Sequence, residues 1–95
     1  MSLFREKVFK IVKKIPQGSF LTYKEVARLA GFSRAYRAVG NALNKNQNPK
    51  IPCYRVIKSN GEIGSYKGGT KKKIALLKKE GIIIENGKIT SRATK

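Results

Sequence analysis

Residues 22–44 read TYKEVARLAGFSRAYRAVGNALN, and this stretch decides the fold that we predict. Thr22 and Glu25 have the spacing of a capping box, in which each side chain accepts a hydrogen bond from the backbone at the start of a helix. We therefore expect a helix over residues 23–30, with Gly31 as the residue that ends it.

A second helix is expected over residues 34–44, with Ser33 as its cap. Helix, short glycine-containing turn and helix together form the layout of a helix-turn-helix. Gly40 lies inside the second helix, where glycine costs on the order of 1 kcal/mol relative to alanine. Two explanations stay open for the small residues Ala38, Gly40 and Ala42: close packing against another helix, or close approach to DNA.

The segments on either side of this pair also follow helical patterns. Apolar residues at helical spacing predict an amphipathic helix over residues 2–15 that begins at Ser2. A last helix over residues 70–80 is expected to begin at Thr70 and to carry a basic face that includes Lys73.

Two Asn-Gly pairs predict hairpin turns. Asn60-Gly61 indicates a type I′ turn in a wing hairpin whose return strand covers residues 63–66, and the segment around Asn86-Gly87 is expected to form either a second small hairpin or an extended tail. The predicted fold is therefore mainly α with a small β-hairpin, a winged-helix-like arrangement in one domain. Its expected parts within residues 1–95 are the helix-turn-helix at about 22–45, the active-site loop and wing at 51–69, the C-terminal helix at 70–80 and the tail at 82–95.

The charge of the chain points to an anionic partner. Its 95 residues include 22 Lys and Arg but only 5 Asp and Glu, a formal net charge of +17. Such an excess repels itself without a counter-charge, and nucleic acid is the usual partner of so basic a domain. The alternative is a soluble protein that is merely basic.

Other composition features exclude several classes of protein. A single cysteine rules out an internal disulfide and fits a reducing compartment, so we expect an intracellular location, either cytoplasmic or nuclear. The chain has no histidine, which leaves no zinc site of the usual kind and no expected metal. No apolar run is long enough to span a membrane, and the N-terminus has no secretory apolar region.

The only cysteine lies in the stretch IPCYRV, residues 51–56. Pro52 stiffens the approach to Cys53, and the permanent cation of Arg55 favours the thiolate, which is the nucleophilic form. The alternative is an inert cysteine that fills space as a small apolar residue.

These motifs together resemble the C-terminal, active-site domain of O6-alkylguanine-DNA alkyltransferases. The resemblance covers nearly the whole chain and rests on the order and spacing of Leu21–Ala27, RAVGNA at 37–42, Asn46, IPCYRVI at 51–57, GEIGSYKGG at 61–69 and KIALLKKEG at 73–81. Pro-Cys-X-Arg-Val with Arg-Ala-Val-Gly and Gly-X-Tyr-X-Gly-Gly is a specific combination.

The resemblance implies that the protein binds double-stranded DNA through the minor groove with its second helix. Arg37 would fill the gap left by a flipped nucleotide, and the small helix residues would allow a close approach. The DNA-binding residues implied are Thr22, Ser33, Arg34, Arg37, Ala38, Gly40 and Asn41. The residues implied for the base pocket are Tyr23, Val56, Tyr66, Lys67 and Gly68.

The resemblance also implies the chemistry. Cys53 would take the alkyl group from O6-alkylguanine, or from O4-alkylthymine, in a single turnover that needs no cofactor. Glu80, Tyr54 and a water would form a relay that activates the thiol. Asn46 would hydrogen-bond the backbone near the cysteine, and Arg55 would brace the loop and stabilise the thiolate.

Three features depart from the family pattern. Tyr54 occupies the place of a histidine, and a phenol with an ordinary pKa of about 10 is a poor base at neutral pH. The N-terminal domain of the family is missing, so we expect a monomer with a separate N-terminal-domain partner as an option. The loop between Asn46 and Cys53 is about one residue short, which affects the match at Pro49.

Two alternative functions remain at this point. One is an alkyltransferase-like protein that recognises damaged guanine without repairing it. The other is a plain winged-helix regulator, which would read the major groove with longer side chains than the second helix offers. Replacing Cys53 distinguishes repair from both.

Overall fold

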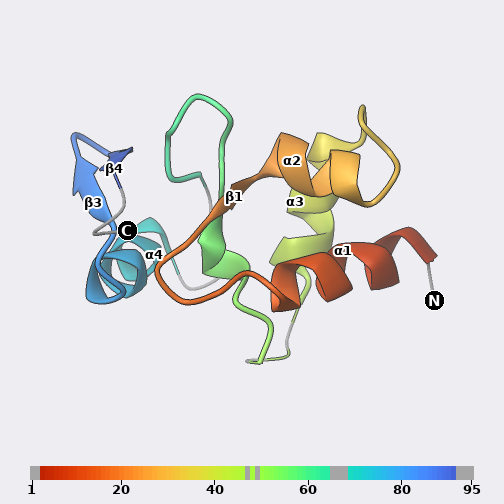
Figure 1. The fold of residues 1–95 in the computed structure, drawn as a ribbon, viewed down its shortest axis with the longest axis horizontal. Helices are drawn as coiled ribbons and strands as arrows, with labels where there is room; N and C mark the ends of the chain where they lie inside the picture. The colour runs from red at the N-terminus through yellow and green to blue at the C-terminus, as the bar shows by residue number, and fades with distance from the viewer. Residues whose placement is uncertain (1–2, 47, 49, 65–68, 92–95) are drawn as a thin grey trace.

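The computed structural model describes residues 3–46, 48, 50–64 and 69–91 (Figure 1). Within them, the helices are α1 (Leu3–Lys13), α2 (Tyr23–Leu29), α3 (Tyr36–Asn44) and α4 (Thr70–Lys79), with the 3₁₀ turn η1 (Cys53–Arg55). The strands are β1 (Leu21–Thr22), β2 (Val56–Ile57), β3 (Ile83–Glu85) and β4 (Lys88–Ser91). The helix-rich fold with a small hairpin is therefore confirmed.

The start and end of α2 follow the prediction. The Thr22 hydroxyl oxygen accepts a hydrogen bond from the Glu25 amide at 3.1 Å, and the Glu25 carboxylate accepts one from the Thr22 amide at 2.8 Å. Gly31, at φ +88°, reverses the chain after the helix, and the Phe32 amide donates to the Ala27 carbonyl at 2.9 Å. This is a Schellman motif, for which glycine is the favoured residue.

The predicted start of the second helix is wrong by two residues. Helix α3 begins at Tyr36 and is preceded by Ala35, which provides no side-chain cap. The Ala35 amide donates to the Phe32 carbonyl at 2.8 Å, so this bond extends the turn that follows α2. Ser33 and Arg34 consequently lie in the exposed turn.

The prediction of a wing hairpin with a return strand directly after β2 is also wrong. Strand β2 pairs in parallel with β1, in the register Leu21↔Val56, instead of with a return strand. A turn does follow β2, because the Gly61 amide donates to the Lys58 carbonyl at 3.0 Å, but Asn60 is not at positive φ as a type I′ turn requires. Residues 63 and 64 form no strand, and residues 65–66 lie outside the described part of the chain.

The second hairpin is confirmed. Strands β3 and β4 pair antiparallel, and Asn86 and Gly87 between them have φ of +54° and +77°. Both central residues are thus in the left-handed region that a two-residue type I′ turn needs. Glu62 forms an isolated bridge with Lys88, which joins the turn after β2 to this hairpin.

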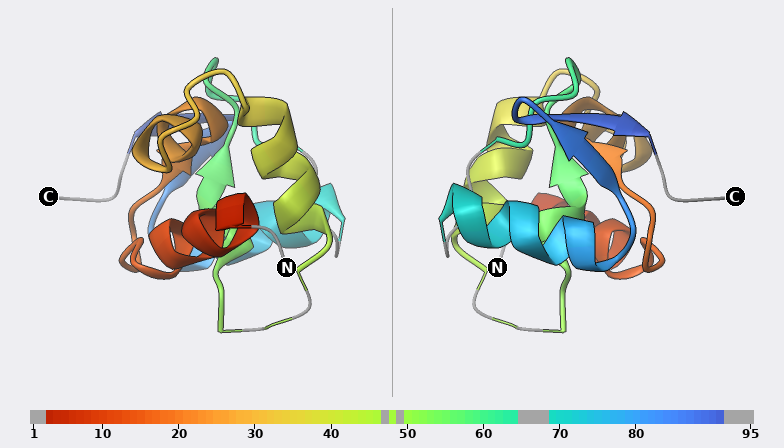
Figure 2. Two further views of the ribbon diagram at one scale, coloured as in Figure 1. Left: turned by 90° about the vertical axis from the view of Figure 1, so that its right-hand side faces the viewer. Right: turned by 90° about the vertical axis from the view of Figure 1, so that its left-hand side faces the viewer.

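Strand β2 lies between two clusters of buried side chains. Val56 belongs to the cluster that joins α1, α2 and α3, and Ile57 belongs to the cluster formed with α4 and β3. Successive side chains of a strand point to opposite faces, so this short strand contributes to both clusters. Figure 2 views the molecule from the side of α1 to α3 and from the side of α4, and the green arrow of β2 lies near the middle of both views. The residues before β2, including Cys53, therefore lie where the two clusters meet.

Helix α4 differs from its predicted pattern. Lys73, expected on an exposed basic face, is buried with 1% of its surface accessible. Gly69 precedes the first residue of the helix, so Thr70 does not cap it. The predicted cap of the first helix, Ser2, lies outside the described residues. In the described part of the chain, no helix is long and apolar enough to cross a membrane.

Candidate active site and nucleic-acid interface

Cys53 opens η1 and is half-buried against the first cluster. Asn46, in the loop after α3, donates a hydrogen bond from its side-chain amide to the Cys53 sulfur at 3.1 Å. The same amide nitrogen donates to the Asn48 carbonyl at 3.0 Å, and the Asn46 side-chain oxygen accepts from the Asn48 amide at 3.0 Å. Asn46 thus lies beside the cysteine as expected, and its contact is with the sulfur itself.

The ionisation of Cys53 reflects opposing influences. Burial raises the pKa of the Cys53 thiol, because a thiolate loses solvation there. The hydrogen bond from Asn46 and the positive charge of Lys73 act in the opposite direction. Asn46 and Lys73 therefore favour the nucleophilic thiolate. Neither of them is Tyr54, the residue that follows Cys53 in the sequence.

Lys73 is the residue that the sequence analysis missed. Its ammonium group donates to the Val56 carbonyl at 2.7 Å and to the Tyr23 hydroxyl at 3.3 Å. Burial lowers the pKa of Lys73 to about 8, and the neighbouring Cys53 acts against that fall. Its spacing could have identified it, because Lys73 is four residues before the buried Leu77 and so lies on the same face of α4.

Tyr54, Arg55 and Glu80 form a clasp on the other side of η1. The Glu80 carboxylate accepts hydrogen bonds from the Tyr54 hydroxyl and from Arg55, whose Nε lies at 3.0 Å and Nη2 at 2.5 Å. It also accepts from the Gly18 amide at 3.2 Å, and Arg55 Nη1 donates to the Ile15 carbonyl at 2.8 Å. The clasp therefore ties η1 and the end of α4 to the loop after α1.

The clasp sets the protonation of its members. Burial alone would raise the pKa of the Glu80 carboxyl, but hydrogen bonds from Arg55, Tyr54 and Gly18 hold it below its ordinary value. Burial and the bond to Glu80 raise the pKa of Tyr54. Tyr54 is thus a protonated donor to a stable carboxylate. The Tyr54–Glu80 contact of the predicted relay is present, but the raised pKa leaves even less phenolate at neutral pH to take a proton from the thiol.

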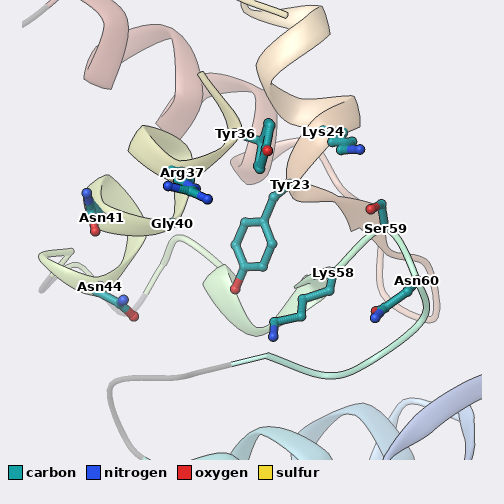
Figure 3. A pocket seen from close by; sticks show the side chains of 10 residues that line it. All are labelled: Tyr23, Lys24, Tyr36, Arg37, Gly40, Asn41, Asn44, Lys58, Ser59 and Asn60. Atoms are coloured by element: carbon teal, nitrogen blue, oxygen red, sulfur yellow. The ribbon is translucent and has the colours of Figure 1, made fainter. Parts of the chain in front are cut away.

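A cavity of about 570 Å³ opens beside Tyr23 (Figure 3). Helix α3 forms one wall and the turn after β2 forms the other, with the Tyr23 ring between them. The cavity is lined by Tyr23, Lys24, Tyr36, Arg37, Gly40, Asn41, Asn44, Lys58, Ser59 and Asn60. Its basic, amide and aromatic groups suit a phosphodiester chain and its bases.

The predicted DNA-binding residues divide into groups. Arg37, Gly40 and Asn41 line the cavity, and Ala38 is exposed on α3. Ser33 and Arg34 line a separate hollow at the turn between the helices. Thr22 uses its hydroxyl in the capping box, and Ala42, expected on the small-residue surface, is buried at 6% exposure.

The predicted base-pocket residues are described only in part. Tyr23 lines the cavity, and the Val56 carbonyl, expected to read a guanine edge, accepts the bond from Lys73. Tyr66, Lys67 and Gly68 lie outside the described residues. Tertiary packing brings Lys58, Ser59 and Asn60 to the cavity. The sequence predicts only a hairpin turn at this point of the chain, with Asn60 in it.

Residues 3–82 match the family model described as the DNA binding domain of 6-O-methylguanine DNA methyltransferase. The chain belongs to this family. The resemblance found in the sequence is therefore confirmed at the level of the family.

Relatives of this methyltransferase family differ in length. A methylated-DNA--protein-cysteine methyltransferase of Methanothermobacter thermautotrophicus is 47% identical over 83 residues, which cover 86% of this chain and 46% of the relative. The chain thus spans about half the length of the curated relatives it matches. Among solved structures, Mycobacterium tuberculosis OGT in complex with DNA has a TM-score of 0.80 at 38% identity, covering 84% of this chain and 50% of that one.

A shorter relative matches over almost its full length. Atl1 of S. pombe, in complex with damaged DNA containing O6-carboxymethylguanine, has a TM-score of 0.84 at 31% identity, covering 97% of this chain and 91% of that one. Both of these solved relatives are complexes with DNA.

Proposed function

We propose that this chain repairs O6-alkylguanine in duplex DNA by moving the alkyl group onto Cys53 in a single turnover. The surroundings of the Cys53 sulfur carry the proposal. The sulfur accepts a hydrogen bond from Asn46 and lies under the influence of the Lys73 charge. An inert, space-filling cysteine needs neither neighbour, whereas a nucleophilic cysteine needs groups that favour its thiolate.

The duplex is proposed to meet the cavity between α3 and the turn after β2. Arg37 would enter the minor groove and occupy the place of the flipped nucleotide, while Lys24 and Lys58 would contact phosphates. Gly40 and the exposed Ala38 keep this part of α3 free of long side chains. A Cβ at Gly40 would lie 3.9 Å from the Tyr23 ring, an ordinary contact, so packing inside the protein does not demand glycine there.

The proposed transfer moves one alkyl group and one proton. The Cys53 thiolate attacks the alkyl carbon, the new bond joins that carbon to sulfur, and the bond to the guanine oxygen breaks. The electron pair of that bond stays on guanine, which takes up a proton in place of the alkyl group, while the thiol has released one. The Tyr23 hydroxyl accepts a bond from Lys73, which leaves its O–H to donate a hydrogen bond to the departing base. Tyr23 keeps its proton overall, because the proton that guanine takes up is balanced by the one that the thiol released.

The product is a thioether, which has no leaving group to restore the thiol, so each chain would react once. The proposed reaction needs no cofactor and only one chain. We therefore propose that the protein acts as a monomer, with the whole site in one domain. An N-terminal domain supplied as a separate chain would act outside the reacting centre.

Recognition of damaged guanine without transfer is the second candidate. It is favoured by Tyr54, which donates to Glu80 where the family resemblance led us to expect histidine. The near full-length similarity to Atl1, which has been captured on DNA with an alkylated guanine, also favours it.

Intact-protein mass spectrometry tests the proposal. The chain is incubated with a duplex oligonucleotide that carries one O6-methylguanine, and Cys53→Ser serves as the matched control. A gain of one methylene per protein, absent in the control, with restoration of guanine in the DNA, supports repair. No gain in mass together with lesion-selective binding in both proteins refutes repair and supports the second candidate.

A further inference from the structure

Lys73 is a buried cation, whereas the other cations among the described residues are accessible to solvent or, like Arg55, paired with a carboxylate. With 1% of its surface exposed, it is the one charged side chain among the described residues that is fully buried. Burying an ammonium group is costly unless its surroundings repay the lost solvation. It donates to the Val56 carbonyl and the Tyr23 hydroxyl, which are neutral oxygens in the walls of the proposed site.

The contacts of Lys73 connect it to the cysteine through the backbone. Val56 ends the η1 turn that Cys53 begins, and its amide donates to the Cys53 carbonyl. Lys73 holds the carbonyl of that same residue at 2.7 Å. The Lys73 ammonium group therefore contacts Val56 at the end of the η1 turn, and Cys53 is the first residue of that turn.

The side chain next to the cysteine cannot perform the activating task. Tyr54 turns its hydroxyl to Glu80, and Glu80 is held as a carboxylate by Arg55 and the Gly18 amide as well. The positive charge of Arg55 is likewise directed to Glu80. These residues stabilise the fold around η1, and the cation whose charge acts on the Cys53 sulfur is Lys73.

We propose that Lys73, rather than Tyr54 or Arg55, supplies the positive charge that stabilises the Cys53 thiolate in this chain. The inference rests on the proposed function insofar as Cys53 is the nucleophile. Among the described residues, the titratable groups that face Lys73 are Tyr23 from α2 and Cys53 from η1, while β2 contributes only a carbonyl. Cys53 is the one of these that becomes an anion in the reaction, so the charge of Lys73 acts on the sulfur.

The test uses iodoacetamide, a small alkylating agent that reacts with the thiolate and needs no DNA. Its rate of reaction with Cys53 is measured from pH 6 to 10 for the wild type, Lys73→Met and Lys72→Met. Lys72 is exposed on the same helix and provides the matched control. Loss of a nearby cation raises the pKa of a thiol, and each pKa step corresponds to about a tenfold loss of thiolate below the midpoint.

We expect Lys73→Met to react at least about tenfold more slowly than the wild type at pH 7. Lys72→Met and Tyr54→Phe should stay within about threefold of the wild type, because neither changes the charge near the sulfur. Lys73→Gln, whose amide can still donate to the Val56 carbonyl, should show the same loss as Lys73→Met. An unchanged pH profile in Lys73→Met, or a loss confined to Tyr54→Phe, overturns the proposal.

A second measurement does not depend on how the Lys73 variants fold. Nuclear magnetic resonance of lysine-labelled protein follows the Lys73 side chain through its titration in the wild type and in Cys53→Ser. Because coupling is reciprocal, removal of the thiolate should lower the pKa of Lys73, and an identical titration in both proteins overturns the proposal. A thiol that depends on Lys73 in a protein that gains no methyl group from DNA supports this inference while refuting repair.

Discussion

The stability of the protein should depend on pH through Lys73. Lysine has an ordinary pKa of 10.5, and burial in the folded protein lowers the pKa of Lys73 to about 8. Between these values the unfolded chain holds more protons than the folded one. The free energy of unfolding therefore rises with pH over this window, and below about pH 8 the full cost of burying the charge is present.

The expected size of this effect follows from the same two values. The difference between 10.5 and about 8 corresponds to about 3.5 kcal/mol, at about 1.4 kcal/mol for each pKa step. Cys53 titrates in the same range and is coupled to Lys73, so the comparison is made between Cys53→Ala and Cys53→Ala/Lys73→Met. Removing Cys53 also removes the neighbour that raises the pKa of Lys73, so the difference should not shrink.

Urea unfolding followed by circular dichroism at constant ionic strength measures the two free energies from pH 7.5 to 10.5. The stability of Cys53→Ala minus that of Cys53→Ala/Lys73→Met should increase by about 3 kcal/mol across this range. The other lysines titrate equally in both proteins and cancel. The same comparison with Lys72→Met should be flat, because that side chain is exposed.

A difference that stays within about 1 kcal/mol from pH 7.5 to 10.5 would refute the reasoning. It would mean that Lys73 keeps its proton as easily in the folded protein as in the unfolded chain. The ammonium group would then be solvated, and it would have little influence on the sulfur.

Three further substitutions test the clasp and the walls of the cavity. Glu80→Gln should lower the free energy of unfolding by about 3 kcal/mol in urea, because Arg55 loses its carboxylate at 14% side-chain exposure. The pKa of Glu80 is below its ordinary value of 4.5, so the wild type should lose this stabilisation as the pH falls below that value. The free energy of unfolding of Glu80→Gln should decline less steeply in acid. Parallel acid profiles of the two proteins would contradict this. Gly40→Ala should raise stability by up to about 1 kcal/mol and weaken binding to a duplex with O6-methylguanine, and unchanged affinity would show that α3 does not approach DNA closely. Gly64→Ala should cost about 1–2 kcal/mol, since φ is +79° and a Cβ would lie 3.3 Å from the Tyr23 hydroxyl; a neutral result would show that Tyr23 gives way easily.

Local features of the structure could be predicted because neighbouring residues create them. The capping box of Thr22 and Glu25 and the glycine that ends α2 involve bonds over a few residues. The Asn86-Gly87 turn likewise follows from two residues that tolerate positive φ. The motif around Cys53 identified the family, since it combines residue types in a specific order.

Other predictions failed where a distant segment competed for the same backbone or side chain. The wing was expected from Asn60-Gly61, but β1 pairs with β2, and the sequence carries no mark of that parallel pairing. Lys73 was placed with the exposed lysines of α4, although it shares a face with Leu77. The buried Lys73 ammonium group donates a hydrogen bond to the Val56 carbonyl, seventeen residues away along the chain.

The sequence by itself determined the family and the helix pair and marked Cys53 as the candidate nucleophile, because these depend on residue types and short spacings. Tertiary structure decided which groups surround the sulfur. It directed Tyr54 and Arg55 to Glu80 and brought Asn46 and Lys73 to the opposite side of η1. The reason is that β2 lies between two apolar clusters, so its neighbours face different parts of the molecule, and charges and hydrogen bonds at each face are set by elements remote in sequence.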